Sequence, residues 1–151
     1  MEVVNLTPHA VTLFHANGST TTYPPSGEVA RVEEQPGSMW APGIYPFPIR
    51  GPSVYGELIG LPPRSPELTV DELAEPFGPP DRVYIVSLFF ADRLRAEVER
   101  AKMEPQPTPG HGWWEAMLRR FRRDDVVTPG DLVRDDAGRI IGCKNVVAAF
   151  R

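Results

Sequence analysis

The fold is decided by residues 82–103, where the sequence RVYIVSLFFADRLRAEVERAKM changes from a strand pattern to a helix pattern. The β-branched and aromatic residues over 82–86 predict a core strand. Ser87 is placed to cap the helix that we expect over 88–103, because its hydroxyl accepts a free backbone N–H of the first turn. The apolar stripe of this helix repeats every three or four residues and consists of Phe90, Leu94, Val98 and Ala101.

A hairpin is predicted near the N-terminus. Asn17-Gly18 separates two β-prone runs, 10–15 and 20–23. This dipeptide favours a tight hairpin turn, because both central residues of such a turn need a positive φ. Apolar and polar residues alternate over 28–33, which predicts a half-buried strand soon after the hairpin.

A second hairpin is predicted near the C-terminus, where 132–134 and 139–143 flank a turn with Gly138 in the left-handed conformation. Apolar positions on one face predict a second helix over 113–122. Because strands lie at both ends of the chain and helices lie between them, we expect an α+β fold. The N- and C-terminal strands should form a small, mostly antiparallel sheet or a partial barrel, with two helices and proline-rich insertions between them.

Length and composition limit the class of protein. A chain of 151 residues is about one domain long, so we expect a single domain over 1–151. The net charge of −4 provides no positive field, so nucleic acid is not favoured as a partner. The chain has one cysteine and no apolar run that could span a bilayer, and because no basic segment precedes an apolar one near residue 1, we expect no secretory signal. We therefore expect a cytoplasmic protein without membrane association, and the oligomeric state stays open.

Familiar enzyme signatures are absent from the sequence, which has no phosphate-binding glycine loop, no His-Glu-x-x-His and no Gly-x-Ser-x-Gly. The histidines lack metal-ligand spacing, and we expect neither a metal site nor a cofactor. His9 could donate a proton or contact a ligand, or it could bond a neighbouring carbonyl in a turn. Cys143 could be a nucleophile, but its position after two isoleucines favours a place in the core.

Two Arg-Asp-Asp triplets, 123–125 and 134–136, flank the last predicted turn and strand. Arginine offers a planar fork of donors to carboxylates or phosphates, and aspartate can hold that fork in position. The two triplets could therefore bind an anionic, hydroxyl-bearing ligand together. They could equally form an ion-pair network that ties the C-terminal hairpin to the preceding helix, and the sequence does not decide between these interpretations.

Several short motifs follow one another along the chain. They are NLTPH (5–9), PPSG with VAR (24–31), GE with GLP (56–62), YIVS (84–87), RDD (123–125) and RD with GRIIGC (134–143). As an ordered set they resemble a family of small proteins of uncharacterised function that tailed bacteriophages and prophages encode. The chain departs from the shorter family pattern in three insertions, at about 35–52, 63–80 and 102–120.

The resemblance implies an accessory protein of a phage that acts in the cytoplasm of a bacterial host, and it supplies no enzyme activity. The family motifs are mostly polar and fall at turns, where a folded scaffold exposes them. The resemblance thus points to eight candidate site residues, namely Asn5, His9, Ser26, Arg31, Ser87, Asp124, Arg134 and Asp135.

The leading hypothesis is a non-catalytic protein that binds and sequesters a small anionic ligand, such as a nucleotide-derived host defence signal. In this hypothesis Arg31, Arg123 and Arg134 meet the negative charge of the ligand. The side chains that orient the ligand are Asn5, His9 and Ser87, and the further ligand contacts are Ser26, Asp124 and Asp135.

Two other hypotheses stay open. The chain could be an inhibitor that docks on a host protein, with Trp40, Trp113 or Trp114 as anchors, because aromatic residues dominate interface hot spots. Trp113 and Trp114 lie in the third insertion, so the family resemblance does not extend to them. The chain could also be a small enzyme that uses His9 or Cys143.

Overall fold

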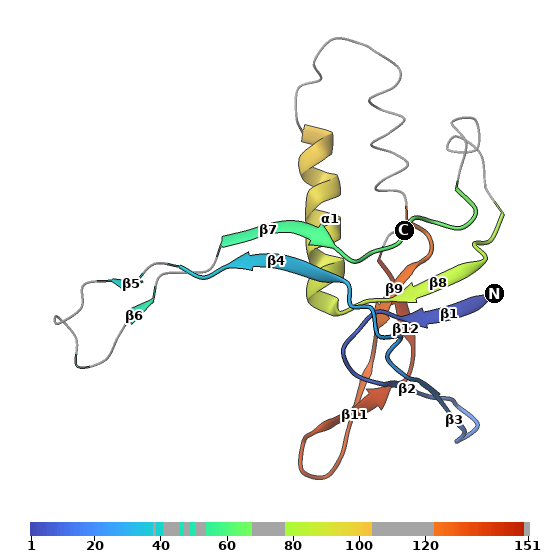
Figure 1. The fold of residues 1–151 in the computed structure, drawn as a ribbon. Coiled ribbons are helices and arrows are strands. Elements are labelled where there is room, and N and C mark those ends of the chain that lie inside the picture. The colour runs from blue at the N-terminus through green and yellow to red at the C-terminus, as the bar shows by residue number, and fades with distance from the viewer. Residues whose placement is uncertain are drawn as a thin grey trace.

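The computed structural model describes residues 1–37, 39–40, 46, 49–50, 54–67, 78–103 and 123–149, with only the backbone described at 39–40, 49–50, 54 and 101–103. Strands and a single helix make up the regular structure of these residues (Figure 1). The elements are β1 (Glu2–Asn5), β2 (Val11–Phe14), β3 (Thr20–Tyr23), β4 (Arg31–Gln35), β5 (Met39–Trp40), β6 (Ile49–Arg50), β7 (Val54–Ile59), β8 (Arg82–Ile85), α1 (Leu88–Met103), β9 (Val126–Pro129), β10 (Leu132–Arg134), β11 (Ile140–Cys143) and β12 (Val146–Ala148).

A four-stranded sheet in the order β1-β8-β9-β12 lies at the centre of the molecule. Strand β8 pairs in parallel with β1 on one side and with β9 on the other, whereas β12 is antiparallel to β9. A strand between two parallel neighbours is usually covered on both faces, which suits a continuous apolar run. Tyr84 and Ile85 of β8 are buried accordingly, so the predicted core strand is confirmed.

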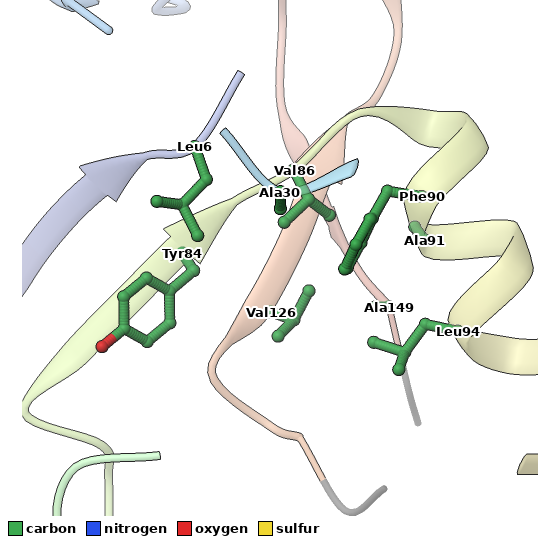
Figure 2. Close-up of a cluster of buried hydrophobic side chains, with 9 residues drawn as sticks. All are labelled: Leu6, Ala30, Tyr84, Val86, Phe90, Ala91, Leu94, Val126 and Ala149. Carbon is green, nitrogen blue, oxygen red and sulfur yellow. The ribbon is translucent and has the colours of Figure 1, made fainter. Parts of the chain in front are cut away.

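The hydrophobic core lies between this sheet and α1 (Figure 2). Helix α1 contributes Phe90, Ala91 and Leu94, which are buried, and Val98 is half-buried. The Ser87 hydroxyl accepts the backbone N–H of Phe90 at 3.2 Å, which confirms the predicted cap. Burying a phenylalanine or leucine side chain stabilises a fold by about 1.5–3 kcal/mol, so these contacts fix the helix on the sheet.

A second sheet, in the order β10-β11-β2-β3, contains both predicted hairpins. Strands β2 and β3 pair around Gly18, whose φ is 84°, and β10 and β11 pair around Gly138, whose φ is 78°. Both hairpins are therefore confirmed. Strand β11 lies parallel to β2, with Cys143 opposite Leu13, so strands from the two ends of the chain meet in this sheet.

A two-stranded ribbon of β4 and β7 passes alongside α1, and the short β5–β6 pair lies at the far end of the ribbon (Figure 1). The register shifts between the pairs Val32↔Leu58 and Glu34↔Tyr55. One residue of β4 there faces two residues of β7, which makes a β-bulge. Residues three apart on a regular strand point to opposite faces, so the bulge turns Tyr55 toward the face that Leu58 occupies.

The expected fold class is wrong. The described chain is mostly β, with several small sheets, one helix and no closed barrel. The core strands of the central sheet are parallel rather than antiparallel, because β1 and β9 both join β8 from distant parts of the sequence.

The second helix predicted over 113–122 lies outside the described residues, and the single domain with three insertions stays a prediction. No helix within the described residues is long and apolar enough to cross a membrane.

Gly60 gives the first testable prediction, because it joins an unusual φ to a close backbone contact. Its φ is 84°, and an added Cβ would lie 2.3 Å from the carbonyl oxygen of Val29. Gly18 also has a φ of 84°, but an added Cβ there meets no atom within 4 Å. We expect Gly18→Ala to lower the free energy of unfolding by about 1–2 kcal/mol through backbone strain alone.

Gly60→Ala should add the cost of the collision, about 1–3 kcal/mol, to the same strain. Urea unfolding of the two variants measures the difference directly. Equal losses in both variants would contradict the close approach of the two backbones.

Candidate functional site

A cleft of about 540 Å³ lies between β7 and α1 and is the strongest candidate for a functional site in the described part of the chain. Its volume falls in the range of about 300–1,000 Å³ that is typical of small-molecule sites. Apolar side chains, among them Leu58 and Leu94, form part of the wall. The charged residues that line it are Arg93, Arg100, Arg123, Glu57 and Glu97.

The helix wall of the cleft carries two arginines that share one carboxylate. Arg93, Glu97 and Arg100 fall on one face of α1, because their spacings are four and three residues. The Nη2 atom of Arg93 lies 3.3 Å from Glu97 Oε1, and Nη2 of Arg100 lies 2.6 Å from Glu97 Oε2. Two positive charges against one negative charge leave this helix face with an excess of positive charge.

Arg93 also holds an unsatisfied donor. Its Nε atom is buried and has no hydrogen-bond partner among the described residues. A guanidinium carries five N–H donors, and leaving a buried one unpaired costs about 1–3 kcal/mol, more for a charged group. The Nε atom itself is enclosed, whereas the Arg93 side chain as a whole is 30% exposed, so an acceptor in the cleft would meet the other N–H groups of the guanidinium.

The strand wall of the cleft presents an aromatic ring. Tyr55 reaches the helix side of the ribbon because of the bulge in β7, and its ring meets the ring of Phe89. The ring centroids are 5.2 Å apart and the planes are inclined by 64°, an edge-to-face contact. Both rings remain partly exposed, Tyr55 at 43% and Phe89 at 50%.

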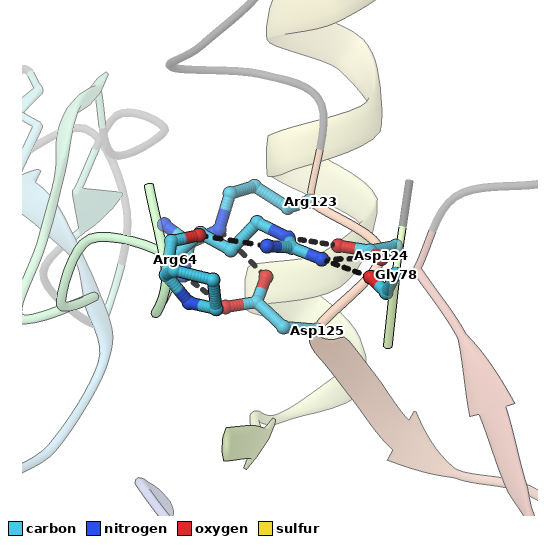
Figure 3. Close-up of polar contacts among 6 residues, drawn as sticks. Arg64, Gly78, Arg123, Asp124 and Asp125 are labelled. Atoms are coloured by element: carbon cyan, nitrogen blue, oxygen red, sulfur yellow. Dashed lines mark hydrogen bonds and ion pairs between the residues drawn. The ribbon is translucent and has the colours of Figure 1, made fainter. Parts of the chain in front are cut away.

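Arg123 lines the cleft and is held by a buried ion pair. Its Nε and Nη2 atoms donate to the two oxygens of Asp125 at 2.8 and 2.9 Å (Figure 3). Two parallel bonds of this kind are the strongest arrangement that arginine makes with a carboxylate. The guanidinium also lies 5.8 Å from the ring centroid of Tyr84, within the range of a cation–π contact.

A second ion pair adjoins the first and uses Arg64, which the sequence analysis did not identify. Arg64 is buried and donates to both oxygens of Asp124, at 2.6 and 3.1 Å. It also donates to the carbonyls of Pro66 and Gly78, at 2.7 and 2.9 Å. The hydrogen bond to Asp124 raises the pKa of the Arg64 guanidinium further above neutrality. The sequence gives little indication of this role, because Arg64 is an isolated arginine in a proline-rich stretch.

Among the predicted site residues, Asn5 is used entirely by the fold. Its Nδ2 atom donates to the carbonyls of His9 and Tyr23, at 2.7 and 2.9 Å. Its Oδ1 atom accepts the backbone N–H and the hydroxyl of Thr7, at 2.9 and 2.7 Å. Asn5 therefore shapes the turn over residues 5–9, and the His9 side chain is exposed on that turn.

The predicted serines also serve local structure. Ser26 exchanges hydrogen bonds with the backbone of Glu28 at 3.2 and 3.3 Å, and its own N–H donates to Asn5 at 3.0 Å. Ser87 caps α1. Arg31 is exposed and lines a second, more open cleft next to Gly60, so it does not lie with Arg123.

The second Arg-Asp-Asp triplet folds back on its own hairpin turn. Asp135 accepts the backbone N–H groups of Ala137 and Arg139, at 3.0 and 2.9 Å, and the Nε of Arg139 at 2.8 Å. Arg134 donates to the carbonyl of Gly138 at 2.8 Å. Figure 1 shows the β10–β11 hairpin extending away from α1, while the start of β9 lies beside β8 and α1. The two triplets are therefore not brought together, and the candidate set does not share one concavity.

The other two hypotheses, a small enzyme and an inhibitor of a host protein, involve Cys143 and three tryptophans. Cys143 is buried, with its sulfur 3.7 Å from the carbonyl oxygen of Thr12, as the core interpretation requires. Only the backbone of Trp40 is described, in β5, and Trp113 and Trp114 lie outside the described residues. Among the residues that are described, no group of three or more His, Cys, Asp or Glu could hold a metal ion.

Comparison with known proteins found no match for this chain among family models, curated proteins or solved structures. The resemblance to a phage family stays a prediction for that reason. The functional interpretation of the cleft accordingly rests on its geometry and on the chemistry of its side chains.

The buried pair of Arg123 and Asp125 gives a prediction about stability. Asp125 is 0% exposed, so Arg123→Ala leaves a buried carboxylate without its partner. Breaking such a pair costs about 3–5 kcal/mol, which should appear as a lower urea midpoint. Arg139→Ala is the matched control, because it breaks a 2.8 Å pair whose arginine is 79% exposed, and exposed pairs contribute about 0–1 kcal/mol. Similar small losses in the two variants would refute the structural role of Arg123.

The thiol of Cys143 gives a prediction about reactivity. Burial raises the pKa of Cys143, which lowers the thiolate fraction at neutral pH, and the thiolate is the reactive form. We expect alkylation by iodoacetamide at pH 7.5 to be far slower in the folded chain than in the same chain unfolded in urea. Equal rates in the two states would show instead that the thiol is accessible and activated.

Proposed function

We propose that this chain is a non-catalytic protein that binds and sequesters a small anionic ligand in the cleft between β7 and α1. The observation that carries the proposal is the helix wall, where Arg93 and Arg100 share the single carboxylate of Glu97. An anion that approaches this helix wall meets two guanidiniums that share one carboxylate. Hydrogen bonds between guanidinium and a charged acceptor are about twice as strong as neutral ones.

The fixed position of Arg123 supports the same proposal. Its guanidinium is anchored by Asp125, so its remaining N–H groups are held in place before any ligand arrives. A donor that is already ordered loses little conformational freedom on binding, which favours affinity. The apolar side chains of Leu58 and Leu94 complete a wall of the mixed type that small-molecule sites have.

The biological setting of the proposal comes from the sequence motifs. Their resemblance to proteins of tailed phages supports a role inside an infected bacterial cell, where a phage protein would lower the concentration of a host signal. Many small signals in bacteria are nucleotides, which are anionic. We therefore propose a nucleotide-derived defence signal as the ligand, and the excess positive charge of the helix wall is consistent with that class.

Mass spectrometry of the small molecules that co-purify with the chain tests the proposal. The wild-type protein is purified from infected or expressing bacteria and denatured, and the released molecules are identified. We expect an anionic molecule at near-stoichiometric amount with the wild type, and its loss in the double variant Arg93→Gln with Arg100→Gln. Both arginines are at least partly exposed and pair only with Glu97 in the described part of the chain, so the variant should keep the fold.

Arg134→Gln is the matched control for this experiment. It removes one positive charge from an exposed arginine at the β10–β11 hairpin, outside the cleft. The control should retain the ligand in full. Loss of the ligand in the control, or its retention in the double variant, would place the binding site elsewhere.

A further inference from the structure

We infer that the cleft takes a nucleotide with its base stacked on Tyr55 and its phosphate bound by Arg93 and Arg100. The inference rests on the proposed function, and it specifies a ligand with two chemically different ends. The Tyr55 ring of β7 supplies the aromatic end of the cleft, and the arginines of α1 supply the cationic end.

The aromatic end is prepared for stacking. Tyr55 lines the cleft and is 43% exposed, although a large ring on a folded protein is normally more deeply buried. Its edge-to-face contact with Phe89 fixes the orientation of the ring, at 5.2 Å between centroids and 64° between planes. A fixed, partly exposed ring is a platform for any flat base, because every base has a π face.

The cationic end follows the aromatic end along one face of α1. Phe89, Arg93, Glu97 and Arg100 are separated by four, four and three residues, so they succeed one another on the side of the helix that faces β7. At 1.5 Å per residue, Arg93 lies about 6 Å beyond Phe89 along the helix. A base against the ring and a phosphate against the first guanidinium would need only one sugar between them.

The two arginines suit a phosphate better than a carboxylate. A phosphate has three terminal oxygens, and a guanidinium binds two of them through parallel N–H bonds. Arg93 and Arg100 each give one described N–H to Glu97, which leaves donors on both sides of that carboxylate. A phosphate in the cleft could bond to the remaining N–H groups of both guanidiniums without replacing Glu97.

Isothermal titration calorimetry of the full chain tests this inference with four probes, which are AMP, GMP, ribose 5-phosphate and inorganic pyrophosphate. We expect at least one nucleotide to bind roughly tenfold or more tightly than ribose 5-phosphate, because base–aromatic stacking contributes about that much. Tyr55→Leu should reduce the affinity for that nucleotide to the level of ribose 5-phosphate and leave the affinity for the two base-free probes unchanged. Tyr55→Phe is the matched control and should bind like the wild type.

Three results would overturn the inference. Equal affinities for ribose 5-phosphate and both nucleotides would show that the base is not recognised. In that case, pyrophosphate binding that depends on Arg93 would still support the proposed anion site. A nucleotide preference that survives Tyr55→Leu would move the base away from this ring. Absence of binding by both nucleotides would also overturn it, and the co-purification experiment would then decide separately whether the cleft binds another anion.

Discussion

The parallel pairing of β8 with β1 and β9 is the constraint on which the rest of the structure depends. It buries Tyr84 and Ile85, and it brings the start of β9, with the Arg123–Asp125 pair, next to β8. The chain leaves β8 through Ser87 directly into α1, and the direction of the strand therefore sets the direction of the helix. Strand β8 therefore positions both walls of the cleft. Helix α1 follows it directly in the chain, and the β4–β7 ribbon packs on the same core.

Local signals in the sequence predicted local structure well. The cap at Ser87, the turn at Gly18 and the turn at Gly138 each depend on residues within a few positions of one another, and all three formed as expected. The fold class failed because pairing between distant strands leaves no comparable mark. The sequence of residues 2–5 carries no signal that this strand pairs in parallel with 82–85. The two predicted hairpins, which are antiparallel, led us to expect an antiparallel sheet.

The candidate site shows the same division. The motif residues were predicted to be ligand contacts, but several of them, including Asn5 and Asp135, make hydrogen bonds that hold turns together. Arg123 is paired with Asp125 and Asp124 is paired with Arg64, and of the two only Arg123 lines the cleft. The pattern of Arg93, Glu97 and Arg100 is equally typical of a solvated helix face. It becomes one wall of a cleft only because β7 lies opposite, and the bulge that turns Tyr55 toward the helix was not evident from the sequence.

Arg64 has a consequence for how this chain can change in evolution. Its guanidinium bonds to Pro66 and Gly78, and the backbone N–H of Asp81 donates to Ser65 at 2.8 Å, so the two ends of the intervening segment are tied at a common neck. With both ends held in this way, a longer loop costs only additional closure entropy, which grows slowly, at about 0.6 kcal/mol per doubling of length. Residues can therefore be gained or lost between these two tied ends while the sheet, the helix and the cleft keep their places.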